Sequence, residues 1–296
     1  MPVAAASAAR FRTLLAAPDM VIAPGAYDAL TARLIERAGF PAVYMTGAGV
    51  SAARGFPDYG LLTLNEMVDS AGVIAHSIST PLICDADTGY GNELNVTRTV
   101  REFEAQGVAA MQLEDQVTPK RCGHFDGKEV VSREEFVRKI RAAVAARRNP
   151  DFAIIARTDA CAVVGFDEAI VRANLALAAG ADIAFVEAVR SLQEMAAVPT
   201  VVRGPCLLNV VPGGKTPPVP LAEARAMGYR LAILPGLLLR EVIFSAEQVL
   251  KVLMQTHVQP DSPADATFFN TLRQLFKADE WDAVRRAYPP AMSEAP

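Results

Sequence analysis

The sequence predicts an α/β fold, a closed (β/α)8 TIM barrel with extra C-terminal helices. About eight short apolar runs alternate with longer segments of helical period, and this alternation indicates a parallel sheet. Polar residues follow most of these runs, where the carboxyl ends of barrel strands form the functional face. An open doubly wound sheet would gather such residues at one switch point, so we favour the barrel.

The predicted strands are short and aliphatic, and a segment of helical period follows most of them. In chain order the strands are residues 21–23, 42–46, 82–84, 109–113, 153–156, 183–186, 207–208 and 231–234. Helices are predicted over residues 29–38, 96–105, 134–146 and 168–179. Gly39, Gly107 and Gly180 stand where a glycine commonly ends a helix.

The chain continues beyond the last predicted strand. A long apolar helix is expected over residues 237–254, then a proline-containing break at 260–263 and a second helical stretch over 268–287. We expect residues 1–296 to form a single barrel domain, with the barrel over about 1–240 and a C-terminal helical extension over about 241–296. Surplus helices commonly cover a partner subunit, which predicts a homo-oligomer.

Composition excludes several classes of protein. The net charge is -4, from 29 basic and 33 acidic residues that are interspersed, so nucleic acid and anionic membranes are not expected partners. No segment has the pattern of a targeting peptide or a membrane span. The four cysteines form no Cys-x-x-Cys pair, which favours reduced thiols in a cytoplasmic protein and excludes a zinc-ligand spacing.

Carboxylates gather after two neighbouring strands. Asp85 and Asp87, two residues apart, are aimed at the same barrel mouth, and Glu114 ends the next strand. Three acids with no equally near lysine would repel one another unless a cation lay between them. Oxygen ligands alone point to Mg²⁺, or Mn²⁺, rather than zinc. The competing interpretation is a helix N-cap and a solvated turn acid.

A thiol lies among cationic residues in the segment 120–124, Lys-Arg-Cys-Gly-His. Positive neighbours lower the pKa of a thiol, which predicts that Cys122 exchanges a proton near neutral pH. Lys120, Arg121 and His124 are costly to bury, so we expect a mobile loop above the barrel. The competing interpretation is a small buried cysteine.

Three further polar residues end predicted strands. Arg157 closes an apolar run, and its planar guanidinium can hold a carboxylate through two hydrogen bonds. Glu187 and Asn209 end the following strands and are equally suited to bind substrate or to pair with Arg157. The segments 47–49 and 213–216 lack the glycines of nucleotide-binding motifs. The backbone amides around Thr46, Gly47 and Ala48 can instead hold a carboxylate.

In this order the motifs resemble the isocitrate lyase and phosphoenolpyruvate mutase superfamily, and within it the short lyases that act on methylisocitrate and 2,3-dimethylmalate. The resemblance covers nearly the whole chain. The motifs that carry it are residues 44–47, 85–91, 112–116, 120–124 and 156–160, and Asn209 with Gly213 and Gly214.

The resemblance implies a barrel that binds Mg²⁺ through Asp85, with Asp87 and Glu114 acting directly or through water and Asp58 nearby on a loop. It implies a set of residues that grip the carboxylate of a small 2-hydroxy or 2-oxo acid: Thr46, Gly47, Ala48 and Arg157. Cys122 would lie on a gating loop, and the other half of the substrate would meet His124, Glu187 and Asn209. The superfamily resemblance also implies a homotetramer whose C-terminal helices are exchanged between subunits.

The implied reaction breaks the C2–C3 bond of a 2-hydroxy dicarboxylate, giving a 2-oxo acid such as pyruvate and a carboxylic acid by retro-aldol or Claisen chemistry. Cys122 would protonate the carbanion, and Tyr44 is a candidate for the base that removes the hydroxyl proton.

The substrate prediction depends on departures from the methylisocitrate lyase pattern. Phe125 and residues 210–212 differ from it, so a third substrate carboxylate would find fewer partners, which favours a 2-alkylmalate such as 2,3-dimethylmalate. Alternatives are a methylisocitrate lyase, a carboxyphosphonoenolpyruvate mutase, and an oxaloacetate hydrolase or decarboxylase. From another class, the chain is a catalytically silent barrel that serves as a binding protein.

Overall fold

The structure, a computed structural model, describes residues 3–288, with side chains from residue 6 onward. It consists of two compact units, Met1–Glu241 and Val242–Pro296. The boundary between the two units lies between Glu241 and Val242.

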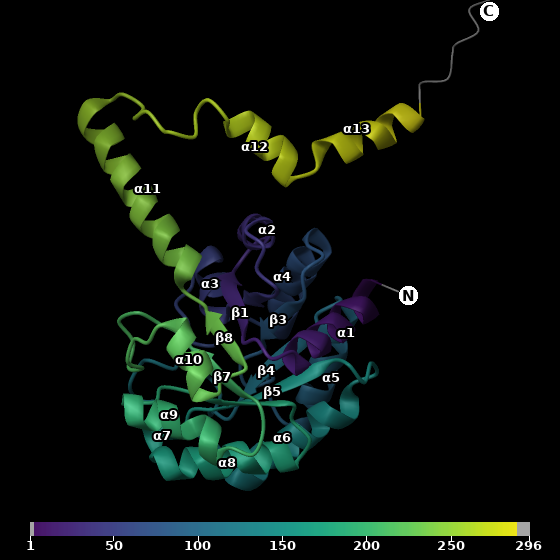
Figure 1. The fold of residues 1–296 in the computed structure, drawn as a ribbon, viewed down its shortest axis with the longest axis vertical. Helices are drawn as coiled ribbons and strands as arrows, with labels where there is room; N and C mark the ends of the chain where they lie inside the picture. Colours follow the sequence, from purple (N-terminus) through teal and green to yellow (C-terminus); the bar gives the residue numbers. More distant parts are fainter. Residues whose placement is uncertain (1–2, 289–296) are drawn as a thin grey trace, which may run out of the picture. The chain divides into compact units, whose positions relative to one another are not determined.

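The first unit contains a closed barrel in which every strand pairs in parallel with its neighbours in the chain, and β1 pairs with β8. The strands are β1 (Val21–Ala26), β2 (Val43–Met45), β3 (Leu82–Asp85), β4 (Ala110–Glu114), β5 (Ala153–Thr158), β6 (Ile183–Val186), β7 (Cys206–Asn209) and β8 (Leu231–Leu234). The predicted strands and the predicted barrel are therefore confirmed, with element ends shifted by a few residues (Figure 1).

Helices follow the strands and surround the barrel (Figure 1). They are α1 (Val3–Ala16), α2 (Ala29–Arg37), α3 (Gly47–Ala53), α4 (Leu64–Ser77), α5 (Glu93–Ala105), α6 (Arg133–Ala146), α7 (Ala160–Val163), α8 (Phe166–Ala178), α9 (Leu192–Val201) and α10 (Leu221–Met227). As expected from their positions, Gly39, Gly107 and Gly180 take positive φ just after α2, α5 and α8.

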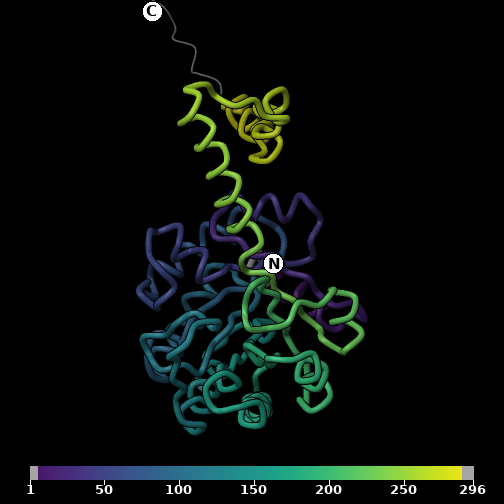
Figure 2. The backbone as a smooth tube through the Cα atoms, turned by 90° about the vertical axis from the view of Figure 1, so that its left-hand side faces the viewer, coloured from purple at the N-terminus to yellow at the C-terminus, as the bar shows by residue number. Residues whose placement is uncertain are grey.

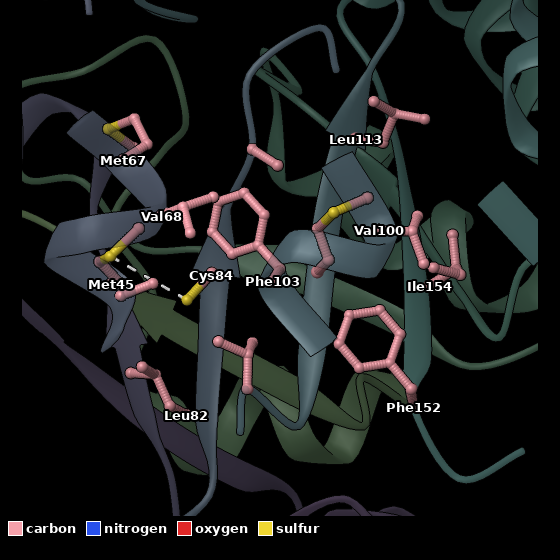
Figure 3. Close-up of a cluster of buried hydrophobic side chains, with 14 of the residues drawn as sticks. Met45, Met67, Val68, Leu82, Cys84, Val100, Phe103, Leu113, Phe152 and Ile154 are labelled. Atoms are coloured by element: carbon pink, nitrogen blue, oxygen red, sulfur yellow. Dashed lines mark hydrogen bonds between the residues drawn. The ribbon is translucent and has the colours of Figure 1, made fainter. Parts of the chain in front are cut away.

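Alternation along the strands divides the core into two layers, because successive side chains point to opposite faces. Inside the barrel lie residues such as Ile83, Ala110, Ile155 and Leu207, and Phe11 of α1 joins this interior cluster. Outside, the intervening residues pack against α4 and α5 (Figure 3), and Cys84 Sγ lies 4.0 Å from Met45 Sδ. The members drawn from these elements are Met45, Met67, Val68, Leu82, Cys84, Val100, Phe103, Leu113 and Ile154.

The second unit carries most of the long helix α11 (Leu237–Thr256), seen in yellow-green in Figure 2, and the shorter helices α12 (Phe268–Leu275) and α13 (Ala278–Ala287). The single helix predicted over 268–287 is wrong, because Lys277 adopts the left-handed conformation at φ 51° and interrupts it. In the part of the chain that the structure describes, no helix is both long and apolar enough to cross a membrane.

Candidate active site

The site residues reach the barrel mouth by the same alternation that builds the interior. Glu114 lies two residues beyond the inward-facing Gln112, and Arg157 lies two beyond Ile155. By the same count Asp85 shares a face with Ile83, and Asn209 shares one with Leu207. Parallel strands end at one rim, so side chains far apart in the sequence converge there.

A cavity of about 140 Å³ lies at the carboxyl ends of the strands. Its walls contain ten of the thirteen residues that the sequence analysis selects: Tyr44, Thr46, Ala48, Asp58, Asp85, Cys122, His124, Arg157, Glu187 and Asn209. Gly47, Asp87 and Glu114 are buried beside it. The wall also contains Lys120, Val211, Ile233, Pro235 and Leu239.

Lys120 occupies a place that the sequence analysis did not give it. Its buried ammonium forms ion pairs with Asp87, at 2.9 Å from Oδ1, and with Asp58. The expectation that the acids have no near lysine is therefore wrong, because the loop that carries Lys120 folds back over Asp58 and Asp87. Burial raises the pKa of Asp87 to about 6, although the ammonium of Lys120 acts in the opposite direction.

The donor set nevertheless fits a hydrated divalent cation. Both carboxylate oxygens of Glu114 are buried and have no hydrogen-bond partner among the described residues. Gly47 keeps the adjacent space open, because a Cβ there would lie 2.8 Å from Asp85 Oδ2 and 3.4 Å from Asp87 Oδ1. Mg²⁺ usually keeps several waters and takes one or two protein carboxylates, which is what such a set supplies.

In the structure, the predicted acids are not arranged so that all of them could bind one ion directly. Within the described residues, no three carboxylate, imidazole or thiol groups converge closely enough to coordinate one ion. Asp58 pairs with Lys120, and Glu114 has Arg157 Nη1 at 3.2 Å from its Oε2. The fit is therefore to an ion held by few direct ligands, with the remaining acids reached through water.

Arg157 lies at the centre of a buried charge network. It donates two hydrogen bonds to Asp159, from Nε at 2.9 Å and from Nη2 at 3.1 Å. Its Nη2 also lies 3.5 Å from Glu187 Oε2. Burial alone would raise the pKa of Asp159, but Arg157 and Lys128 lower it to about 2. These ion pairs hold the guanidinium in place at the pocket wall. Its role in binding a substrate stays a prediction.

Cys122 lies on a loop that we call the Cys122 loop, residues 117–129, bracketed by the bridge between Gln116 and Val130. Its backbone N–H donates to Asp58 O at 3.2 Å, which ties the loop to the segment before α4. Burial raises the pKa of the Cys122 thiol, so the expectation of a lowered pKa is wrong. The cationic neighbours act in the expected direction, but loss of hydration outweighs them, so the sulfur keeps its proton at neutral pH.

Tyr44 connects the pocket wall to Asp85 through an amide. Its hydroxyl donates to Gln112 Oε1 at 3.1 Å, and Gln112 Nε2 donates to Asp85 Oδ1 at 3.3 Å. Burial raises the pKa of Tyr44 well above its ordinary value. This phenol keeps its proton in a hydrogen bond and ionises only at high pH. It is therefore better suited to orienting Asp85, through Gln112, than to removing a proton.

Two polar atoms at the pocket remain free for a ligand. Asn209 donates from Nδ2 to Glu187 Oε2 at 2.9 Å, while its Oδ1 has no partner among the described residues. His124 Nε2 is likewise buried without a hydrogen bond and lies 3.7 Å from Glu187 Oε1. Thr46 caps α3 by accepting from Gly49 N at 3.3 Å, which directs the first turn of that helix at the pocket.

Sequence reasoning missed three buried residues that support the site. Gln112 orients Asp85, Asp159 holds Arg157, and Lys128 pairs with Asp159 at 2.8 Å and donates to Gly123 O on the Cys122 loop. Gln112 carried a signal, because a polar residue inside an otherwise apolar strand predicts a buried partner. Lys128 carried none, since an isolated loop lysine usually lies in solvent.

Comparison with known proteins finds related chains. A family of phosphoenolpyruvate phosphomutases matches residues 11–254. The 2,3-dimethylmalate lyase of Eubacterium barkeri is 54% identical over 230 residues, covering 77% of this chain and 80% of that protein. The 2-methylisocitrate lyase of Aeropyrum pernix is 45% identical over 250 residues, covering 84% and 80%.

Solved structures of similar chains share the fold. Oxaloacetate acetylhydrolase in complex with the inhibitor 3,3-difluorooxalacetate has a TM-score of 0.91 at 38% identity, with 95% of this chain and 96% of that chain covered. A structure of 2,3-dimethylmalate lyase has a TM-score of 0.90 at 39% identity, with 98% of this chain and 98% of that chain covered. A phosphonopyruvate hydrolase solved with oxalate and Mg²⁺ has a TM-score of 0.83 at 29% identity, with 95% and 99% covered.

Proposed function

The chain belongs to the phosphoenolpyruvate phosphomutase family, within the isocitrate lyase and phosphoenolpyruvate mutase superfamily, and on this premise we propose that it is a magnesium-dependent carbon–carbon lyase. Its substrate would be a 2-hydroxy dicarboxylate of the 2-alkylmalate type, such as 2,3-dimethylmalate. The observation that carries the proposal is that Cys122, a thiol whose pKa is raised by burial, lies in the same pocket wall as Asp85, Arg157 and Asn209.

Four acids would hold the metal: Asp85 directly, and Asp87, Glu114 and Asp58 through water. When bound, the divalent cation lowers the pKa of the substrate 2-hydroxyl as a Lewis acid. The carboxylate next to that hydroxyl would meet Arg157 and the backbone amides of residues 46–48. Support comes from the geometry of Arg157, whose two hydrogen bonds to Asp159 fix the guanidinium before a substrate arrives.

The distal carboxylate would lie against His124 and Asn209. His124 has an unpaired Nε2. Asn209 Nδ2 gives one hydrogen to Glu187 Oε2 at 2.9 Å, and its second hydrogen would be the one to donate to the substrate carboxylate. This assignment of the substrate-binding residues accounts for a dicarboxylate without calling on a third anion site.

Cys122 would act as the proton donor. When the C2–C3 bond breaks, its electron pair goes to C3, the 2-oxygen becomes a carbonyl oxygen after loss of the hydroxyl proton, and C3 takes the proton from Cys122 Sγ. A raised pKa suits this role, because the thiol must carry its proton when the carbanion forms. The base that accepts the hydroxyl proton is left unassigned, since Tyr44 already donates its own proton.

The test is turnover of a panel of 2-hydroxy diacids and triacids, oxaloacetate and phosphonopyruvate, with and without EDTA, identifying the 2-oxo acid released. Cleavage of a 2-alkylmalate that requires metal and disappears in Cys122→Ser supports the lyase. The matched control is Cys161→Ala, since Cys161 is buried away from the pocket. No turnover of any diacid by the unaltered protein overturns the proposal and favours a silent binding barrel.

Oxaloacetate hydrolysis is the second candidate, favoured by the TM-score of 0.91 to oxaloacetate acetylhydrolase. The same panel separates the two functions. Turnover of oxaloacetate with release of oxalate and acetate, and none of a malate derivative, would assign the chain to hydrolysis. Release of pyruvate from oxaloacetate, unaffected by Cys122→Ser, would indicate decarboxylation.

We also infer a homo-oligomer, a tetramer by family resemblance, working in the cytoplasm. Support comes from the second unit, where apolar side chains such as Phe244, Phe269 and Trp281 are 60%, 78% and 73% exposed. Contiguous exposed apolar surface usually marks an interface, and exchange of the C-terminal helices with another subunit would cover it. A monomer in sedimentation of the full chain at micromolar concentration would contradict this inference.

A further inference from the structure

The loop after β7, residues 210–219, contacts the Cys122 loop at two points. The backbone N–H of Lys215 donates to His124 Nδ1 at 3.1 Å, and Lys215 Nζ lies 2.6 Å from Asp126 Oδ1. Gly214 allows this approach, because a Cβ there would lie 2.6 Å from His124 Nδ1. A side chain at position 214 would therefore collide with the imidazole ring that accepts from Lys215 N.

This contact determines which ring nitrogen carries the proton. A backbone N–H can only donate, so His124 Nδ1 must accept and therefore has no proton of its own. The neutral ring then carries its single proton on Nε2. The other tautomer would set two N–H groups against each other at 3.1 Å.

The proton on Nε2 has no acceptor among the residues that the structure describes. His124 Nε2 is buried without a partner, and Glu187 Oε1, at 3.7 Å, is beyond hydrogen-bond distance. Glu187 is engaged elsewhere, with Oε1 accepting from Ala188 N at 2.7 Å and Oε2 accepting from Asn209 Nδ2 at 2.9 Å. An unused donor therefore remains in the pocket wall.

We propose that the Lys215 amide is a positioning element that holds His124 as the Nε2–H tautomer, so that the ring offers a neutral hydrogen-bond donor to a carboxylate oxygen of the substrate. The identity of that carboxylate, the distal one of a 2-hydroxy diacid, rests on the proposed function. The opposite tautomer would present a lone pair to the same anion and repel it.

The surroundings of the ring keep it neutral. Burial lowers the pKa of His124, and the cations Arg157 and Lys128 lower it further, while Glu187 and Asp159 act in the opposite direction. A neutral imidazole has one donor and one acceptor, so the Lys215 amide alone is enough to select the tautomer. The ion pair with Asp126 is not needed for it, since Asp126 is almost fully exposed and such pairs contribute little.

Nitrogen-15 NMR of the full-length protein, labelled at histidine, tests the tautomer directly. The chain has three histidines, and His124→Gln identifies the signals of His124. We expect the wild type to show a protonated Nε2 and an unprotonated Nδ1. Lys215→Pro removes the N–H, and Gly214→Ala displaces the ring; each should yield a mixture of tautomers or a doubly protonated ring.

Lys215→Ala is the matched control, because it keeps the backbone N–H and removes only the ion pair; it should leave the tautomer unchanged. A wild-type ring protonated on Nδ1, or an unchanged tautomer in both Lys215→Pro and Gly214→Ala, would overturn the inference. In kinetics, Gly214→Ala should raise KM for the diacid about threefold to tenfold, the value of one neutral hydrogen bond, with a smaller change in kcat. If the tautomers respond as expected in a protein that cleaves no diacid, the positioning role is supported and only the proposed substrate is overturned.

Discussion

Lys120 Nζ and Asp87 Oδ1 lie 2.9 Å apart in a buried ion pair, at the place where the sequence predicts that carboxylates gather around a metal. The ammonium supplies fixed positive charge to Asp87 and to Asp58. On the proposed function, Lys120 and a divalent cation would be two sources of the same neutralising charge, one permanent and one exchangeable.

Replacing Lys120 should make the protein depend on metal for stability. In Lys120→Met, Asp58 and Asp87 lose the ammonium that pairs with them. Leaving a buried charge unpaired costs about 3–5 kcal/mol. Thermal unfolding with and without Mg²⁺ should show a lower melting temperature in EDTA and a larger rise on adding Mg²⁺ than in the wild type. Lys128→Met is the control: it removes another buried lysine, paired with Asp159, and should lose stability without gaining a response to Mg²⁺. An equal response in all three proteins would contradict the proposed neighbouring metal.

The reactivity of Cys122 should follow its raised pKa. The thiolate is the species that alkylating agents attack, so at pH 7 iodoacetamide should modify Cys122 slowly, and the rate should still be rising above pH 9. Mass spectrometry of the modified peptide as a function of pH measures this, and Cys122→Ser gives the background from the buried cysteines. A rate that reaches its plateau near pH 7 would instead support the lowered pKa expected from the sequence.

Local pattern predicts the barrel well, because strand alternation and helical period are properties of short segments. Asp85, Glu114 and Arg157 could be placed at one rim because each directly follows a predicted strand. The position of Lys120 could not, because it depends on how a loop of irregular backbone folds back over another strand. The same limit explains the wrong prediction for Cys122: its charged neighbours are visible in the sequence, while its burial is not.

Tyr44→Phe should separate an orienting role from catalysis by a base. The variant loses the hydrogen bond to Gln112, so the amide that donates to Asp85 is held less firmly. We expect kcat for the diacid to fall less than about tenfold and the apparent affinity for Mg²⁺ to weaken by a similar factor, since one hydrogen bond contributes about 1 kcal/mol. A loss of a thousandfold in kcat with unchanged Mg²⁺ affinity would identify Tyr44 as the base.

Asp159 should govern the acid stability of the barrel mouth. Its pKa is about 2 in the folded chain against an ordinary 3.8, so the unfolded chain binds more protons between these values and stability falls as the pH drops through them. This contribution, about 2 kcal/mol, is fully present above about pH 4.

Asp159→Asn should unfold at lower urea concentration at pH 7, because Arg157 and Lys128 lose their shared partner. The difference from the wild type should shrink as the pH approaches 3. The control is Asp69→Asn, at an exposed position of α4. It should change neither the urea concentration of unfolding at pH 7 nor its dependence on pH. A difference between Asp159→Asn and wild type that stays constant from pH 7 to pH 3 would show that the carboxylate charge is not what holds Arg157 in place.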